Sequence, residues 1–305
     1  MTQYAIVGLK DYRVEISNKD FALLRTATTH FFEILSIEEK LNLVVENYAE
    51  FEKELFNCSL NRMLFGVENW TSGIGGVHSM NRRIVNLLTT CRLYIDQTSH
   101  NICSIYGNDS EQEKIFKKQA SQEYDSDYPG YRTMEAMRNY VQHRELPVRI
   151  LNNKMQLVGT GSNELWKHTI KLSIDINTLS KDGKFKKKVL TELQSLGESV
   201  ELTPLIRQYL RSIGKIHLKI RELLNSDLSA WEEQIRNPLK QYKEATGYVD
   251  GLRAIAINES KTIETISILE DVIKRRQMLE NKNKYLTHYP FHFISSEAPE
   301  IRIES

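Results

Sequence analysis

Three polar residues in the stretch MRNYVQHRELP, residues 137–147, have side chains that can bind a phosphate and move protons. Arg138 carries a permanently charged, planar guanidinium, which suits phosphate oxygens. His143 carries an imidazole that titrates near neutral pH, and Asn139 carries an amide that can orient a neighbouring side chain. Residues of these types at this spacing form either a functional site or an ordinary solvent-facing helix end.

The stretch is expected to lie on a helix that begins near Tyr131 and stops before Pro147. With a step of about 100° per residue, one side of this helix is apolar and faces the core. That side carries Met134, Met137, Tyr140 and Val141. Arg138, Asn139 and His143 share the opposite side, where Asn139 and His143 are i,i+4 neighbours that can hydrogen-bond. A solvated face also explains this polarity, although Asn and His are mediocre helix formers for an idle surface.

The composition is that of an ordinary globular chain and indicates no particular partner. The 305 residues carry a net charge of +1, so a nucleic-acid surface would have to come from local clustering. This length allows one large domain or two smaller ones. Cys58, Cys91 and Cys103 form no CxxC pair and no set with metal-ligand spacing. With no recognisable secretory signal and no long uncharged apolar run, the chain is expected in the cytoplasm, with no membrane partner.

A short hairpin followed by helices is predicted ahead of the motif, because the chain has few prolines and glycines. Alternating residues on either side of residues 8–11 predict this hairpin within residues 1–19. The first clear helix is expected to begin at Ser36, where Glu39 completes a capping box, and to end at Gly66.

Residues 71–79, TSGIGGVHS, are interpreted as a flexible connector. Their glycines could suggest phosphate binding, but a phosphate-binding loop follows a strand and ends in GK[ST], and neither feature is present in the sequence. A long helix is predicted from Met80 to Tyr106, and a polar helix over residues 111–124. A turn then leads into the motif helix.

The sequence pattern changes after Pro147, which is taken as a boundary between residues 20–147 and residues 148–305. Two strands are predicted beyond it, in VRILNNKMQLVG (residues 148–159) and HTIKLSIDINTL (residues 168–179). Further helices are predicted from Thr203, a capping residue followed by proline, and over residues 259–283. The fold is therefore expected to be mainly α, with a helical bundle, a small β element and further long helices.

Two groups of basic residues could follow a nucleic-acid backbone. The first surrounds Phe185 in a loop and helix start and consists of Lys181, Lys184, Lys186, Lys187 and Lys188. The second forms a ridge at i,i+4 spacing and includes Arg207, Arg211 and Lys215. Either group could contact phosphates, and a plain solvated surface is the alternative for each. His217, near the apolar stripe of the same helix, is expected to be packed rather than to act as a ligand.

The run RNYVQH, from Arg138 to His143, resembles the R-x4-6-H motif of the HEPN family, the higher eukaryotes and prokaryotes nucleotide-binding domain. In that family a polar residue, often asparagine, commonly follows the arginine, and Asn139 fits this pattern. NRRIVNLLTTCRLYIDQ, residues 81–97, resembles the long helix that precedes the motif helix. The likeness covers about residues 20–150, and it implies a HEPN-like helical bundle over residues 20–147.

The resemblance also implies an activity, that of a dimeric, metal-independent ribonuclease of the kind found in toxin–antitoxin, anti-phage and CRISPR systems. His143 would be the general acid/base, Arg138 would hold the phosphate, and Asn139 would orient His143 or the substrate. The implied partners are RNA, a second copy of the chain, and an antitoxin or other regulatory protein; no cofactor is required. Other members of the family are catalytically silent, so a non-catalytic helical dimerisation or interaction protein is the alternative.

Overall fold

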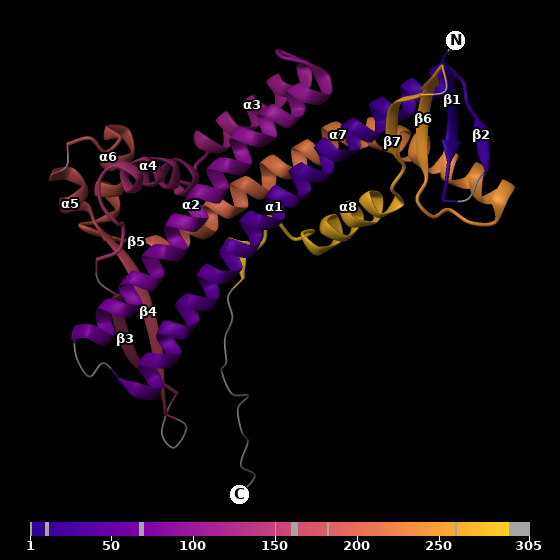
Figure 1. The fold of residues 1–305 in the computed structure, drawn as a ribbon. Coiled ribbons are helices and arrows are strands. Elements are labelled where there is room, and N and C mark those ends of the chain that lie inside the picture. Colours follow the sequence, from indigo (N-terminus) through magenta and orange to yellow (C-terminus); the bar gives the residue numbers. More distant parts are fainter. Residues whose placement is uncertain are drawn as a thin grey trace, which may run out of the picture. The chain divides into compact units, whose positions relative to one another are not determined.

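A computed structural model of the chain is mainly helical, with two small antiparallel sheets among the described residues (Figure 1). The structure describes residues 2–9, 12–66, 70–149, 151–159, 164–181, 183–259 and 261–292, the side chains of residues 70–72 excepted. The predicted class, mainly α with a small β element, is confirmed. In these ranges no helix has an apolar stretch that could cross a lipid bilayer.

Two compact units make up the chain, and each is assembled from separate stretches. The first unit consists of Met1–Asn47, Thr89–Ser121 and His217–Lys284, and the second of Tyr48–Leu88, Gln122–Ile216 and Tyr285–Ser305. Three long helices contribute residues to both units: α1 (Asn18–Phe65), α2 (Trp70–Tyr106) and α7 (Leu202–Thr246). The sequence boundary at Pro147 lies inside the second unit.

The first unit contains a four-stranded antiparallel sheet in the order β2-β1-β6-β7. Its strands are β1 (Gln3–Val7), β2 (Arg13–Glu15), β6 (Arg253–Asn258) and β7 (Lys261–Ser267). The predicted hairpin within residues 1–19 is confirmed, since Ile6 pairs with Val14, while the tip residues 10 and 11 lie outside the described ranges. The hairpin is not isolated, because β1 also pairs with β6 through Ala5 and Ile255.

The predicted helix over residues 259–283 is wrong in its first half, which is β7; the helical part is only α8 (Glu270–Lys282). Ile263 and Ile266 have i,i+3 spacing, which suggested one face of a helix. In the strand Ile266 is buried, whereas Ile263 lies at an irregularity in the pairing with β6 and is exposed. Because β-branched Thr and Ile are enriched here, in the adjacent pairs Thr262–Ile263 and Thr265–Ile266, the strand is the locally favoured structure.

The first helix begins at Asn18, far ahead of the predicted start at Ser36. Ser17 caps it: the Asp20 backbone N–H donates to Ser17 Oγ at 3.0 Å, and the Ser17 N–H donates back to Asp20 Oδ2 at 3.3 Å. Upstream apolar residues are buried in helical spacing, namely Phe21, Leu24, Ala27 and Phe31. The predicted end at Gly66 is confirmed, with φ +66 and its N–H bonded to the Arg62 carbonyl.

The connector predicted at residues 71–79 is wrong, because α2 is helical from Trp70. Glycine costs a helix about 1 kcal/mol relative to alanine, so tertiary contacts have to compensate. At Gly76 a β-carbon would lie 2.9 Å from Cδ1 of Leu151, so glycine allows the following sheet to approach the helix closely. The predicted end at Tyr106 and the polar helix over residues 111–124, α3 (Glu111–Tyr124), are confirmed.

The second unit holds the motif helix, α4 (Gly130–His143), and a three-stranded antiparallel sheet in the order β3-β4-β5. The remaining elements are β3 (Leu151–Val158), β4 (Leu165–Asp175), α5 (Ile176–Lys181), α6 (Lys187–Leu196), β5 (Ser199–Glu201) and a 3-10 turn (Tyr289–Phe291). Both predicted strands are present, although residues 176–179 of the second belong to α5. The start of α7 at Leu202 agrees within one residue with the predicted start at Thr203.

A buried hydrogen-bonded cluster of four side chains lies in the core of the first unit. The His217 ring is 0% exposed; its Nε2 lies 3.1 Å from Glu38 Oε1, and its Nδ1 lies 2.9 Å from the Tyr94 hydroxyl. Arg221 donates two bonds to Glu38, at 2.8 and 2.7 Å. A neutral imidazole with its proton on Nε2 satisfies both contacts of His217. The expectation that His217 is a packed residue is confirmed.

The cluster changes the acidity of its members. Burial lowers the pKa of His217 below its ordinary value, although Glu38 opposes this effect. Burial alone would raise the pKa of Glu38, but the charges and hydrogen bonds of His217 and Arg221 hold it well below its usual range. The lowered pKa of His217 favours a neutral imidazole beside the carboxylate–guanidinium ion pair of Glu38 and Arg221.

Candidate functional site

The motif helix is fixed at its N-terminal end by α7. The Gly130 N–H donates to Gln208 Oε1 at 3.0 Å. A β-carbon at position 130 would lie 2.4 Å from Cβ of Gln208 and 2.5 Å from the Leu205 carbonyl oxygen, so only glycine permits this approach. One and a half turns further on, Glu135 accepts a 2.7 Å bond from the buried Tyr209 hydroxyl. The position of α4 within the second unit is thereby set by specific contacts.

A second anchor holds the turn that leads into α4. Arg132 forms an ion pair with Glu192 through two of its nitrogens. Its remaining nitrogen donates to the carbonyl oxygens of Tyr124, Ser126 and Tyr128. Since one guanidinium satisfies three carbonyls that no helix pairs, the segment between α3 and α4 has a defined conformation.

The segment that follows the motif is held by Asn81 of α2. Its Nδ2 donates to the Val148 carbonyl at 2.7 Å, and its Oδ1 accepts the Val148 N–H at 3.0 Å. Both residues are buried. The sequence analysis did not identify Asn81 as a positioning residue; its only sequence signal is a polar residue beside the apolar stripe of Met80 and Ile84.

We expect Asn81→Ala to lower the free energy of unfolding by about 2–4 kcal/mol, because it leaves two buried backbone groups without partners, each costing about 1–3 kcal/mol. Urea unfolding measures the effect. Asn57→Ala is the matched control, the same change at an exposed helical position, in α1, and should stay within about 0.5 kcal/mol. Equal stabilities of the two variants would show that the Asn81 clamp does not hold the segment.

The predicted orientation of α4 is confirmed. Met134, Met137 and Tyr140 are buried, whereas Asn139 and His143 are exposed and Arg138 is half-buried. The polar groups of the motif therefore lie outside the core of the protomer. His143 is the last residue of the helix.

Arg138 and Asn139 are in direct contact. Arg138 Nη1 donates to Asn139 Oδ1 at 3.0 Å, so in the described part of the chain the amide orients the guanidinium rather than the imidazole. Arg138 Nε is buried and has no acceptor among the described protein groups. The buried Nε is out of reach of a ligand, but the bond to Asn139 uses only one of the four terminal N–H donors, so a phosphate oxygen could accept from the others.

Arg138 and His143 do not converge within one protomer. Five residues of helix separate them by about 140° around the axis and about 7.5 Å along it. His143 lies on the side of Tyr140, its i−3 neighbour, whereas Arg138 lies toward the far side of the polar face. A single reaction centre that uses both side chains therefore needs either a substrate that spans the helix end or a second copy of the chain.

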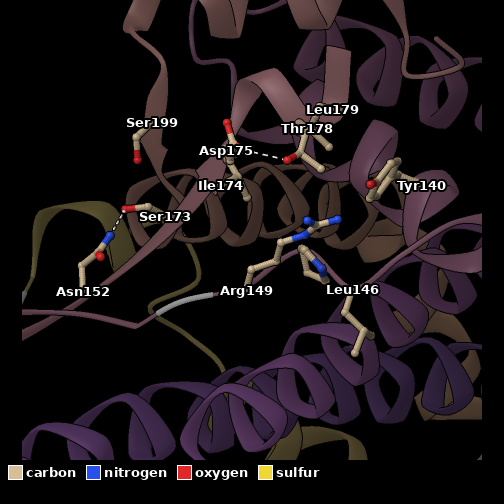
Figure 2. A pocket seen from close by; sticks show the side chains of 11 residues that line it. Tyr140, Leu146, Arg149, Asn152, Ser173, Ile174, Asp175, Thr178, Leu179 and Ser199 are labelled. Carbon is tan, nitrogen blue, oxygen red and sulfur yellow. Dashed lines mark hydrogen bonds between the residues drawn. The ribbon is translucent and has the colours of Figure 1, made fainter. Parts of the chain in front are cut away.

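A cavity of about 310 Å³ lies next to this helix end (Figure 2). Tyr140 forms part of its wall. The segment after α4 contributes Leu146, Pro147 and Arg149, and the sheet with α5 contributes Asn152, Ser173, Ile174, Asp175, Thr178, Leu179 and Ser199. The sequence analysis identified none of the cavity residues beyond α4 as functional, because they come from five separate segments.

The first basic group is exposed, apart from its aromatic member. Lys184, Lys187 and Lys188 are exposed, and Phe185 is buried against the Tyr140 ring at a centroid distance of 6.0 Å. Lys186 lies over the Tyr124 ring, 4.4 Å from its centroid, and bonds to its hydroxyl. The exposed amines are compatible with both interpretations of this group, a surface that contacts phosphates and a plain solvated surface.

The second basic group is largely engaged with the protein itself. Arg207 makes a two-bond ion pair with Glu52, each bond 2.8 Å long, and Lys215 lies 3.3 Å from Glu123. Arg211 stacks over Tyr128, with its guanidinium carbon 4.8 Å from the ring centroid. These contacts give the ridge a structural role, and they reduce its capacity to bind a nucleic-acid backbone.

Comparisons with protein-family models, with curated proteins and with solved structures found no match for this chain. The likeness to the HEPN family therefore rests on the motif and its helical context.

Proposed function

We propose that the chain is a metal-independent endoribonuclease of the HEPN type, acting in the cytoplasm as a homodimer. The observation that carries the proposal is the state of Arg138. Its guanidinium is half-buried on the polar side of α4 and oriented by Asn139, whose bond uses one of the four terminal N–H donors. A fixed cation with free donor capacity, on the same helix as an exposed imidazole, fits a phosphodiester substrate.

RNA supplies its own nucleophile, the 2′-hydroxyl. In the proposed reaction an imidazole of His143 removes the 2′-hydroxyl proton while the 2′-oxygen attacks phosphorus. The bond from phosphorus to the 5′-oxygen breaks, and the leaving oxygen takes up a proton from the second imidazole of the dimer. Arg138 stabilises the charge that develops on the non-bridging oxygens. The products carry a 2′,3′-cyclic phosphate and a 5′-hydroxyl.

The separation of Arg138 and His143 around α4 supports the dimer. Two copies of the helix, related by a two-fold axis and facing each other through their polar sides, would bring each Arg138 near the His143 of the other copy. The same arrangement would cover the face that the protomer leaves exposed and would supply the two imidazoles that the two proton transfers use.

The alternative is a non-catalytic helical protein that uses the same face of α4 to dimerise or to bind a partner. The exposure of Asn139 and His143 is compatible with it. A toxin or anti-phage defence effector, controlled by an antitoxin or another regulatory protein, is the cellular role proposed for the nuclease. The two proposals differ in what purified protein does to RNA.

The test is to incubate purified protein with total RNA in the presence and absence of EDTA, with light scattering at micromolar concentration to establish its mass. We expect a dimer that cleaves RNA equally in both conditions and leaves cyclic phosphate ends, because no step uses a metal. A dimer that leaves RNA intact would favour the non-catalytic protein. A strictly monomeric chain would count against the nuclease and against dimerisation through α4, and would leave a non-catalytic protein that binds a different partner.

A further inference from the structure

The cavity beside α4 has a lining of two kinds. Its floor is apolar and buried, formed by Pro147, Ile174 and Leu179, and the buried Tyr140 ring lies in the wall. Its rim is mostly polar, with the exposed Leu146 as an apolar member, and Figure 2 shows that its side chains come from the segment after α4, the sheet and α5. A ligand that fits has flat apolar faces and a hydrogen-bonding edge, which is the description of a nucleobase.

The rim offers groups that both donate and accept hydrogen bonds. Asn152 Nδ2 bonds to Ser173 Oγ at 3.3 Å, and this leaves the amide oxygen and one amide hydrogen for a ligand. Ser199, exposed at the start of β5, adds another hydroxyl. Such groups can pair with the edge of a base, which carries donors and acceptors side by side.

The charges at the rim discriminate among phosphates. Arg149 is exposed and can bind one phosphodiester, but it already forms an ion pair with Glu145. Asp175 adds a second carboxylate, which accepts bonds from the Thr178 hydroxyl at 2.7 Å and the Asn177 N–H at 2.9 Å. Two carboxylates beside one guanidinium disfavour a terminal phosphate, which carries nearly two negative charges, relative to a phosphodiester, which carries one.

The cavity adjoins the proposed reaction centre. Tyr140, in its wall, is the i−3 neighbour of His143, and side chains three residues apart on a helix have β-carbons about 5–6 Å apart. A base seated on the cavity floor would therefore place its own phosphodiester within about one nucleotide of the imidazole.

We propose that the cavity binds one nucleotide of an RNA strand, next to the phosphodiester that is cleaved, with the base against Tyr140 and the strand phosphate on Arg149. This proposal rests on the proposed function and extends it by naming a subsite. Because the rim groups read the base edge, the cavity gives the cleavage a base preference at one position.

Binding of uncleavable 2′-deoxy dinucleotides, measured by calorimetry at low salt, tests the subsite without relying on catalysis. We expect the four homodinucleotides to bind with unequal affinities, and nucleoside 5′-monophosphates, ribose 5-phosphate and inorganic phosphate to bind more weakly. Arg149→Ala should weaken dinucleotide binding roughly tenfold or more, since it removes a charged hydrogen bond. Ser199→Trp, which fills the cavity from an exposed strand position, should abolish binding.

Lys154→Ala is the matched control, because it removes one positive charge from an exposed position of β3 outside the cavity. It should change affinity less than threefold or so at low salt, as expected for one distant charge. Equal dinucleotide binding by wild type and Ser199→Trp would overturn the subsite. Tighter binding of 5′-monophosphates than of dinucleotides would assign the cavity to free nucleotides instead and also overturn it.

The binding results and the cleavage results together distinguish a failure of the nucleotide subsite from a failure of the proposed nuclease activity. Dinucleotide binding that depends on Arg149, in a protein that leaves RNA intact, would retain the cavity as a nucleotide site and reject the nuclease. Cleavage at the wild-type rate and with the wild-type base preference in both cavity variants would reject the subsite and retain the nuclease.

Discussion

Alanine at position 143 is expected to lower the rate of RNA cleavage by a factor of about 10²–10⁴, the usual contribution of a general acid or base. Arg138→Ala should lower it by roughly 10²–10³, because it removes donors that stabilise charge in the transition state. The two side chains have roles that cannot substitute for each other, since one moves protons and the other holds charge. The double variant should therefore be little slower than the worse single variant.

Both variants should keep the fold. Arg138 and His143 lie off the buried stripe of Met134, Met137 and Tyr140, so truncation opens no core cavity and should change stability by about 0.5 kcal/mol or less. Gln142→Ala is the matched control, an exposed polar residue on the same helix, and should cleave like wild type. Arg138→Lys keeps the charge but loses the planar fork, so an intermediate rate is expected.

The measurement compares initial rates on a labelled RNA at equal concentrations of dimer, with circular dichroism to establish folding. Cleavage by folded His143→Ala at the wild-type rate would reject the role of the imidazole. Loss of activity in Gln142→Ala would show that substitution anywhere on the polar face disturbs the dimer, and the effect at His143 would then say nothing about proton transfer.

The motif helix could be predicted from the sequence because its information is local. Apolar residues recur with the period of a helix, and the polar ones fall on one face whatever the rest of the chain does. The same reasoning gave the β3–β4 strands and the ends of α1 and α2. Gly66 ends α1 because glycine adopts the positive φ that the helix end needs.

The sequence reasoning failed where distant contacts decide the structure. Residues 71–79 read as a connector because three glycines disfavour a helix, yet at Gly76 the missing side chain makes room for Leu151. The pairing of β1 with β6 joins residues about 250 positions apart, and no local pattern encodes it. The role of Asn81 depends on its contact with Val148, 67 residues further along the chain. The cavity lining beyond α4 likewise comes from five separate segments.

The largest effect on stability is expected from Glu38→Ala in the core of the first unit. Removing the carboxylate leaves the Arg221 guanidinium without the ion pair that offsets its burial, and it leaves the His217 Nε2 proton without an acceptor. Loss of one partner of a buried ion pair costs about 3–5 kcal/mol. Urea unfolding at pH 7.5 should show this loss.

Two further variants test whether the loss of stability depends on the position of the carboxylate and on its charge. Glu39→Ala makes the same change one residue later, at an exposed carboxylate 3.5 Å from Arg275, and should cost less than about 1 kcal/mol. Glu38→Gln keeps an acceptor of the same shape but removes the charge, so its stability should lie between those of Glu38→Ala and wild type. A Glu38→Ala protein as stable as Glu39→Ala would show that the ion pair is not buried as described.

The same cluster predicts the sign of the pH dependence. The pKa of His217 is lowered in the folded protein, so below about pH 6.5 the unfolded chain takes up a proton that the folded chain does not. Stability is then fully present above that pH and falls as the pH is lowered toward 5.5. Glu38 contributes nothing in this window, because its lowered pKa matters only below about 4.5.

His217→Gln should flatten the fall between pH 7.5 and 5.5, since glutamine can bond to both Glu38 and Tyr94 but does not titrate. A wild type that is equally stable at both pH values would mean that folding does not shift the pKa of the imidazole, and a wild type that is more stable at pH 5.5 would mean that the buried imidazole is protonated, with Glu38 shared between two cations.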